Sequence, residues 1–129
     1  MKQLIYRSRP FRNEGGTLGE ILMTAWTNNR LHQISGALIC RDDLFLQLIE
    51  GPDDKIDALY ANIKADKRHT DVRTLVEAQV NSRILAAWSM LDARTVPEDR
   101  TEIAVDSATP DQLRAMFERI AAAARDIPE

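Results

Sequence analysis

The hydrophobic positions of the chain recur with two different periods, one typical of strands and one typical of helices. Several short runs combine loose alternation or continuous apolar stretches with Ile, Val, Phe and Tyr, the residues that strands favour. A polar turn at residues 41–43 joins two of these runs into a hairpin. The pattern predicts strands at residues 4–9, 35–40, 44–49, 72–80 and 85–92.

Three other segments have apolar residues at the spacing of an amphipathic helix. The first covers residues 18–31 and begins at a capping box formed by Thr17 and Glu20. The second begins at Pro52. Two acidic residues follow in its first turn, at the positive end of the helix dipole, and cations lie near its C-terminus, at the negative end. The third covers residues 109–126 and has the apolar stripe Leu113, Met116, Phe117, Ile120 and Ala124.

The order of these elements, βαββαββ followed by a helix, indicates the fold class. Its first six elements follow the ferredoxin-like arrangement, in which two helices cover one face of a sheet. We therefore expect an α+β fold with a ferredoxin-like βαββαβ unit, an extra strand that makes a five-stranded mixed sheet, and a C-terminal helix. We divide the chain into a core at 1–92, a polar connector at 93–108 and a helix at 109–126. This helix is expected to pack on the sheet face away from the site or at an oligomer interface.

Composition indicates one soluble globular domain. The chain has 129 residues, of which 44% are hydrophobic and 29% charged. Cys40 is its one cysteine, so no intramolecular disulfide can form, and we expect a cytoplasmic location. A net charge of −3 weighs against a nucleic-acid partner. No apolar run reaches the roughly 18 residues of a membrane span, so we expect no membrane partner.

The sequence lacks the motifs of the common enzyme classes. It has no glycine-rich phosphate loop and no serine in the context of a nucleophile elbow. Its histidines and its cysteine lack the spacing of metal ligands, so no metal site is expected. These absences predict a protein that is not an enzyme.

A few polar residues break the local pattern. Gln47 lies inside an apolar run, where a carboxamide without partners would cost about 1–3 kcal/mol. Tyr6 lies in the middle of the first strand, and Asn28 and Asn29 close the first helix. Each has an ordinary explanation: an edge-strand glutamine, a half-buried strand tyrosine or a helix cap.

Taken together, these residues indicate a binding site. The first and third strands of a ferredoxin-like sheet are central neighbours, so Tyr6 and Gln47 can lie side by side on one face. The end of the first helix, with Asn28 and Asn29, can lie over the same face. A phenol and three carboxamides offer donors and acceptors but no strong acid or base. Such a set suits a flat heterocycle with alternating N–H and C=O groups, and it does not suit hydrolysis.

The same residues belong to a longer pattern that resembles the BLUF family, the sensors of blue light using FAD. The matching segments run in order from residue 4 to residue 90. They are Leu4-Ile5-Tyr6-Arg7-Ser8, Asn28-Asn29, Ile34-Ser35-Gly36-Ala37-Leu38, Phe45-Leu46-Gln47-Leu48-Ile49-Glu50-Gly51, Asp66-Lys67-Arg68-His69, and Arg83 with Trp88-Ser89-Met90. No single segment is specific, but the combination is. The sequence departs from the family in having Leu85 three residues before the tryptophan and Ile49 before Glu50, both of which keep apolar character.

The resemblance implies a role for each matching residue. Tyr6 would donate an electron and a proton to the photoexcited flavin, and Gln47 would bridge Tyr6 and the flavin. Asn29 would hold the carbonyl and imide edge of the flavin, with Asn28 beside it. Further residues implied in binding are Ile34 and Ile63, which would pack on the ring, and Phe45, which would line the pocket.

Another group of implied residues lies later in the chain. Arg68 and His69 match family positions near the pyrimidine side and ribityl chain of the flavin, and Asp66 opens the same segment. Apart from the resemblance, Lys64 and Lys67 are candidates for the phosphates because of their charge and their place on the second helix. Trp88 and Met90 match the family's switching residues, which relay the signal.

The resemblance implies FAD as the cofactor, with FMN and riboflavin as alternatives. We expect the signal to pass to a separate effector protein, and we expect a homodimer or a higher homo-oligomer. Two other interpretations stay open from the residues alone. One is an acylphosphatase-like hydrolase, which would need the loop around Arg12 to hold an anion, and the other is a ferredoxin-like interaction module without flavin.

Overall fold

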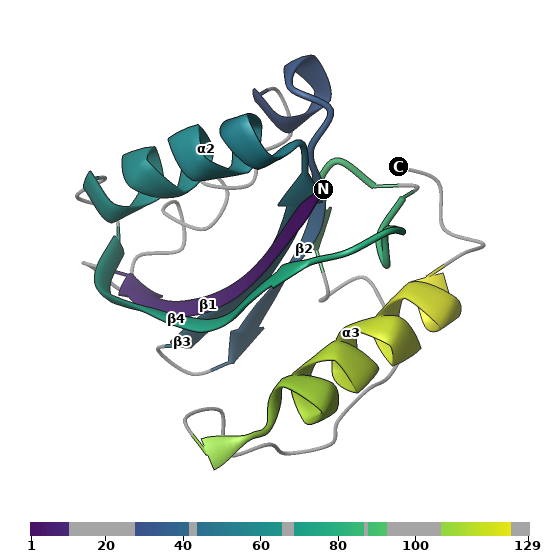
Figure 1. Cartoon of the computed structure of the whole chain (residues 1–129). Helices are drawn as coiled ribbons and strands as arrows, with labels where there is room; N and C mark the ends of the chain where they lie inside the picture. Colours follow the sequence, from purple (N-terminus) through teal and green to yellow (C-terminus); the bar gives the residue numbers. More distant parts are fainter. Residues whose placement is uncertain (11–27, 42–43, 66–68, 87, 93–106, 125–129) are drawn as a thin grey trace.

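The computed structural model describes residues 1–10, 28–41, 44–65, 69–86, 88–92 and 107–124, which form a sheet with a helix on each face (Figure 1). The strands are β1 (Lys2–Pro10), β2 (Ser35–Arg41), β3 (Leu44–Gly51), β4 (His69–Gln79) and β5 (Leu91–Asp92), and the helices are α2 (Asp53–Ala65) and α3 (Pro110–Ala124). Residues 28–31 form a helical turn before β2. The expected α+β class is confirmed.

Four strands of the sheet are antiparallel, in the order β4-β1-β3-β2. This is the order of a ferredoxin-like sheet, and it places β1 and β3 at the centre. The short β5 pairs in parallel with β2 and extends that edge. The central position of β1 and β3 places their side chains under the helices on both faces.

One predicted strand is largely wrong. The chain was expected to be extended over residues 85–92, but only Leu91–Asp92 form a strand. The preceding described residues form bends and a turn, and side chains hold them in place of a strand ladder. The first predicted helix, at 18–31, lies mostly outside the described residues, apart from the turn at 28–31.

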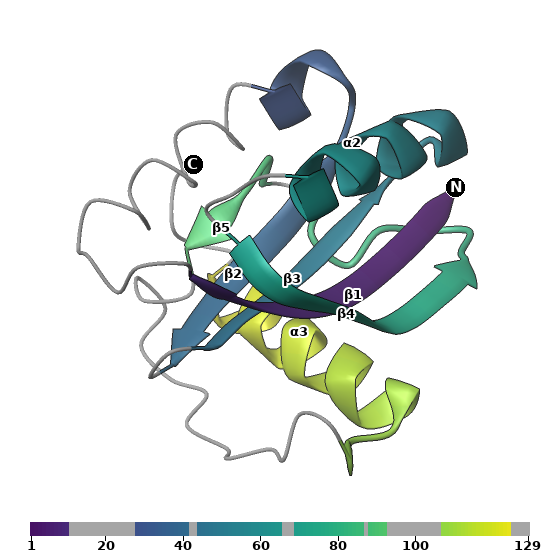
Figure 2. The same ribbon diagram turned by 90° about the vertical axis from the view of Figure 1, so that its left-hand side faces the viewer.

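The two faces of the sheet have separate hydrophobic cores (Figures 1 and 2). The α2 cluster consists of Leu4, Tyr6, Ile34, Leu38, Phe45, Ile49, Ile56, Tyr60 and Met90. The α3 cluster consists of Ile5, Ala37, Ile39, Leu46, Leu48, Val76, Leu85, Trp88, Leu91 and the buried residues of α3. Successive residues of β1 and β3 alternate between the two clusters, as the pleat of a strand requires.

Helix α3 covers the face of the sheet opposite α2. Its N-terminus carries a capping box, in which the Gln112 amide donates to Thr109 Oγ1 at 3.1 Å and the Thr109 amide donates to Gln112 Oε1 at 2.9 Å. The five residues of the predicted apolar stripe are all buried. Most of the connector at 93–108 lies outside the described residues, so the proposed domain boundaries stay a prediction.

Gly36 allows β2 and β3 to approach closely. A Cβ at this position would lie 2.2 Å from the carbonyl oxygen of Leu48, which real side chains do not tolerate. The absence of a side chain therefore allows the hydrogen bonding that joins β2 to the centre of the sheet.

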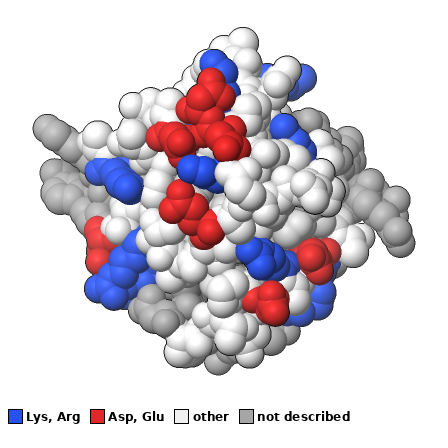
Figure 3. Space-filling model, in the orientation of Figure 1, with Lys and Arg blue, Asp and Glu red and all other residues white. Residues whose placement is uncertain are grey.

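The surface in Figure 3 has acidic side chains gathered over α2, with basic groups among and around them. Lys2 Nζ lies 2.6 Å from Asp57 Oδ1 and 3.2 Å from Glu77 Oε1. Neither sign of charge covers this face as a whole. Among the described helices, none is both long enough and apolar enough to cross a membrane.

Candidate functional site

Tyr6 and Gln47 lie directly opposite each other on the central strands β1 and β3. The Tyr6 hydroxyl donates a hydrogen bond to Gln47 Oε1 at 2.5 Å. Both side chains are buried, with exposed fractions of 0% and 3%. The misplaced glutamine of the third strand is therefore satisfied by the misplaced tyrosine of the first.

A second tyrosine lies beside this pair. The rings of Tyr6 and Tyr60 have centroids 5.1 Å apart and are tilted by 47°, a common geometry for aromatic pairs. The hydroxyl of Tyr60 shares a hydrogen bond of 2.5 Å with Thr74 Oγ1 on β4. Burial raises the pKa of the Tyr6 phenol well above its usual range, and burial also raises the pKa of Tyr60. Both phenols therefore stay protonated at neutral pH.

The C-terminal part of α2 contributes two of the predicted residues. Ile63 is half-buried and packs against the α2 cluster. Lys64 is exposed, and its Nζ lies over the ring of Tyr60, 4.5 Å from the ring centroid. Its contact in the described structure is a cation–π interaction, and its role toward a phosphate stays a prediction.

Asn29 lies in the helical turn before β2. Its side chain is fully buried, and its Nδ2 donates to the Ser89 carbonyl at 2.8 Å. Its Oδ1 is the one buried side-chain oxygen or nitrogen without a hydrogen-bond partner among the described residues. A buried acceptor in this state costs about 1–3 kcal/mol, so the position calls for a donor. The neighbouring Asn28 is exposed.

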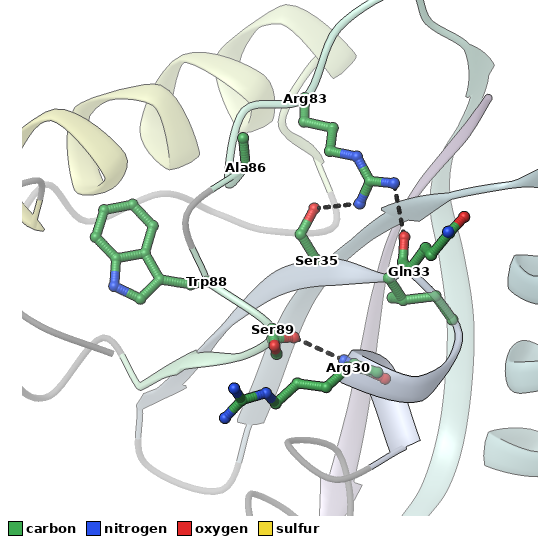
Figure 4. A pocket seen from close by; sticks show the side chains of 9 residues that line it. Arg30, Gln33, Ser35, Arg83, Ala86, Trp88 and Ser89 are labelled. Atoms are coloured by element: carbon green, nitrogen blue, oxygen red, sulfur yellow. Dashed lines mark hydrogen bonds between the residues drawn. The ribbon is translucent and has the colours of Figure 1, made fainter.

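A pocket of about 470 Å³ opens between the turn after residue 28, the start of β2 and the segment before β5 (Figure 4). It is lined by Asn29, Arg30, Gln33, Ile34, Ser35, Arg83, Ala86, Trp88 and Ser89. Tyr6 and Gln47 do not line it. Ile34 connects the two regions, because it lines the pocket and also belongs to the α2 cluster with Tyr6.

Trp88 and Met90 are both buried, but they lie on opposite sides of the sheet. Met90 belongs to the α2 cluster together with Tyr6, whereas Trp88 packs in the α3 cluster. The backbone between them passes Ser89, whose carbonyl accepts the hydrogen bond from Asn29. A change at Asn29 therefore has a direct connection to the segment that carries both side chains.

The structure buries several of the predicted site residues, and their roles stay a prediction. Tyr6, Gln47, Asn29, Ile34 and Phe45 are buried around β1, β3 and the start of β2. The backbone of His69 begins β4, but its side chain is outside the described residues, as are Asp66 and Arg68 entirely. Within the described ranges, no group of His, Cys, Asp and Glu side chains is arranged to hold a metal ion.

Two contributors were missed at the sequence level. Tyr60 was not singled out in the second predicted helix, although a buried aromatic residue with a hydroxyl group needs a hydrogen-bond partner. Glu50 was treated as part of a motif, although a carboxylate directly after Leu48 and Ile49 is as much out of place as Gln47. Its full burial makes it the strongest anomaly of β3.

A family model described as sensors of blue-light using FAD matches residues 1–91 of the chain. The chain belongs to this family, the BLUF family. It is a blue-light sensor that binds a flavin. This membership decides against the hydrolase and against the flavin-free interaction module.

Known relatives agree with the family assignment. The photoactivated adenylate cyclase subunit beta of Euglena gracilis is 38% identical over 77 residues, which are 59% of this chain and 9% of that protein. The chain therefore spans only a small part of the curated relative, and the BLUF match does not transfer the cyclase activity. The dark-state structure of the BLUF protein BlrB is 28% identical, covers 95% of this chain and 96% of its own, and has a TM-score of 0.77.

A third similarity concerns the cofactor. The structure of Klebsiella pneumoniae BlrP1 with FMN and cyclic diGMP is 27% identical and has a TM-score of 0.67. It covers 97% of this chain and 34% of its own. The flavin in that structure is FMN, so the choice between FMN and FAD is not fixed by the fold.

The described residues fit a flavin on chemical grounds. The unpartnered Oδ1 of Asn29 can accept from a ring N–H, and the Tyr6–Gln47 pair offers donors and acceptors to a ring edge. Ile34 and Phe45 provide apolar surface in the same cluster. The buried acceptor of Asn29 is the observation that most directly requires a ligand.

Proposed function

We propose that this BLUF domain binds FAD non-covalently and uses Tyr6 and Gln47 as its photoactive pair. The observation that carries the proposal is the buried hydrogen bond of 2.5 Å from the Tyr6 hydroxyl to Gln47 Oε1. Asn29, Asn28, Ile34, Phe45 and Ile63 would hold the ring system. The side chains of Lys64, Asp66, Arg68 and His69 are proposed for the ribityl and phosphate part.

The bound flavin supplies a strong one-electron oxidant when it absorbs blue light. Tyr6 is proposed to lose an electron and a proton together, because burial raises the pKa of its phenol and disfavours a free phenolate. The hydrogen bond to Gln47 Oε1 would give the proton its path away from the phenol. The electron would pass to the photoexcited flavin and would come back to Tyr6 with the proton, so neither Tyr6 nor the flavin would end the cycle changed in oxidation state.

The lasting change is proposed to reside in Gln47. A carboxamide has a donor end and an acceptor end, so its rotation or tautomerisation reverses the hydrogen bonding that it offers to Tyr6 and to the ring. Hydrogen bonds in a dry site are strong, so this reversal is energetically significant. An altered hydrogen bond to the ring would move the absorption slightly to the red.

The signal is proposed to leave through the segment that carries Trp88 and Met90 and to reach a separate effector protein. Helix α3, on the opposite face, is a second element through which a partner or another copy of the chain can be contacted. We propose a homodimer or a higher homo-oligomer. A cytoplasmic location is proposed because one cysteine excludes an intramolecular disulfide.

The photochemical test is a light-minus-dark absorption spectrum of the flavin-loaded protein. Wild type is expected to show a red shift that reverses in darkness, and Gln47→Leu is expected to lose it. Gln79→Leu, the same substitution at an exposed position of β4, serves as the matched control and keeps the shift. A normal shift in Gln47→Leu would refute the proposed switch. Chromatography of the released flavin distinguishes FAD from FMN and riboflavin.

A further inference from the structure

The segment that carries Trp88 and Met90 is held by side chains at its upstream end. Residues 81–86 form bends and a turn, so no strand partner satisfies the amides of Ile84 and Leu85. Both amides instead donate to the carboxylate of Glu50 on β3. The Ile84 amide lies 2.9 Å from Oε1, and the Leu85 amide lies 2.7 Å from Oε2.

The carboxylate of Glu50 is fully buried. Its backbone lies in the middle of the sheet, opposite Gln3 of β1 and Ser35 of β2. Ser35 Oγ also donates to Oε2 at 3.4 Å. Hydrogen bonds to a charged acceptor are about twice as strong as neutral ones, and a buried carboxylate is stable only where such donors surround it. Glu50 therefore ties the segment to the end of the central strand β3.

Arg83, on the segment itself, adds further hydrogen bonds at this end (Figure 4). Its Nη1 donates to Ser35 Oγ at 2.9 Å and to the Glu50 carbonyl at 3.2 Å, and its Nη2 donates to the Gln33 carbonyl at 2.6 Å. One guanidinium thus joins the start of β2, the end of β3 and the segment itself. Glu50 and Arg83 with these contacts are called the Glu50–Arg83 anchor below.

The downstream part of the segment has different contacts. The Gly36 amide donates to the Trp88 carbonyl at 3.1 Å, and Asn29 Nδ2 donates to the Ser89 carbonyl at 2.8 Å. Leu91 then enters β5 beside β2. The described residues 86 and 88–90 therefore lie between two held ends, the anchor upstream and β5 downstream, and Asn29 contacts Ser89 between these ends.

We propose that Glu50 is a positioning residue of the light signal. Glu50 fixes the upstream end of the segment. A change at the Ser89 carbonyl then rotates the side chains of Trp88 and Met90, which point to opposite faces of the sheet. Without Glu50, the upstream end is loosened, and the segment samples both arrangements already in darkness. This inference rests on the proposed function, because it takes Asn29 as the residue that contacts the flavin.

The test uses the flavin-loaded full chain with Trp26→Phe, so that Trp88 is the remaining tryptophan of the two in the sequence. In this background Glu50→Gln keeps the shape of the side chain but replaces one acceptor oxygen by an NH2 group. Amide exchange of Ile84 and Leu85 in darkness is expected to rise on the order of tenfold or more, the equivalent of one charge-assisted hydrogen bond. Glu77→Gln, an exposed carboxylate on β4, is the matched control.

The second measurement is the light-minus-dark difference in Trp88 emission. In Glu50→Gln this difference is expected to fall by more than half while the size of the flavin red shift is kept, because the loosened segment already samples both arrangements in darkness. A purely structural Glu50 would raise amide exchange and leave the Trp88 difference intact, and that result would overturn the proposal. Unchanged exchange at Ile84 and Leu85 would overturn it as well.

Arg83→Gln gives an independent test, because it removes the guanidinium hydrogen bonds of the anchor and leaves the carboxylate in place. Faster amide exchange at Ile84 and Leu85 and a reduced Trp88 emission difference are expected again, both smaller than in Glu50→Gln. If neither appears, the result counts against the anchor. Exchange in darkness requires no photochemistry. If wild type shows no red shift, the proposed function fails, and with it the coupling, whereas the exchange data still report whether Glu50 holds the segment.

Discussion

The hydrogen bond between Tyr6 and Gln47 allows a quantitative prediction from a double-mutant cycle. Tyr6→Phe removes the donor and keeps the ring next to Tyr60, so the aromatic contact at 5.1 Å is preserved. Gln47→Leu removes the acceptor and keeps a similar volume. Because both side chains are buried, each single variant leaves one polar group without its partner.

The magnitude follows from that asymmetry. An unsatisfied buried polar group costs about 1–3 kcal/mol, so each single variant is expected to lower the free energy of unfolding by an amount in this range. The double variant removes both polar groups and leaves an apolar contact between two central strands. Its loss is expected to be smaller than the sum of the single losses by about 1–2 kcal/mol.

The assay is urea unfolding in darkness, with flavin at the same large excess over its Kd for every variant. A ligand that binds the folded state adds RT ln(1 + [L]/Kd) to stability, so the Kd of each variant is measured and this contribution subtracted. Equal m-values are required for the comparison. If the losses of the two single variants add to within about 0.3–0.5 kcal/mol, the two side chains are independent and the reasoning is refuted.

Three further predictions follow from the packing and the pKa shifts. Gly36→Ala is expected to destabilise the protein in thermal unfolding, because its Cβ would collide with the Leu48 carbonyl oxygen. An ordinary Gly→Ala substitution in a strand stabilises by roughly 0.5–1 kcal/mol, so a stability gain would contradict the close approach of β2 and β3. Both tyrosines have raised pKa values in the folded protein, so the stability that they contribute is complete below about pH 10, the unfolded value, and is lost as the pH rises through the folded values. An absorption titration near pH 10 should therefore show less tyrosinate in the folded protein than in the unfolded protein, and equal fractions would be the contrary result. Phe117→Ala is expected to lower stability by about 3–5 kcal/mol and to keep the red shift, and loss of the shift in folded protein would show that the two faces are not separate.

The pairing of Tyr6 with Gln47 could be predicted from the sequence because it depends on few assumptions. Alternation places each residue on a face, and the ferredoxin-like order makes their strands neighbours. The register that aligns the two residues is observed in the structure. The polar mismatch of Gln47 was informative because burial of a carboxamide requires a specific partner.

The segment before β5 could not be predicted in the same way. Its apolar residues resemble a strand, but a strand also needs a partner for its backbone, and the local sequence does not say whether one is present. Here Glu50, more than thirty positions earlier, takes the place of the ladder. The opposite placement of Trp88 and Met90 is likewise a matter of the bends between them, which periodicity does not encode.

The alternation of side chains along β3 also bears on how such a protein can diversify. Gln47 points toward the α2 cluster, and its neighbour Leu48 packs in the α3 cluster. Adjacent residues therefore contribute to different faces, one with the pair proposed for the photochemistry and the other supporting α3. Substitutions that preserve volume on the α3 face can accumulate while the chromophore side stays constant, so a lineage can acquire new partners without rebuilding its photocycle. The same separation gives protein engineers a face on which to redesign binding.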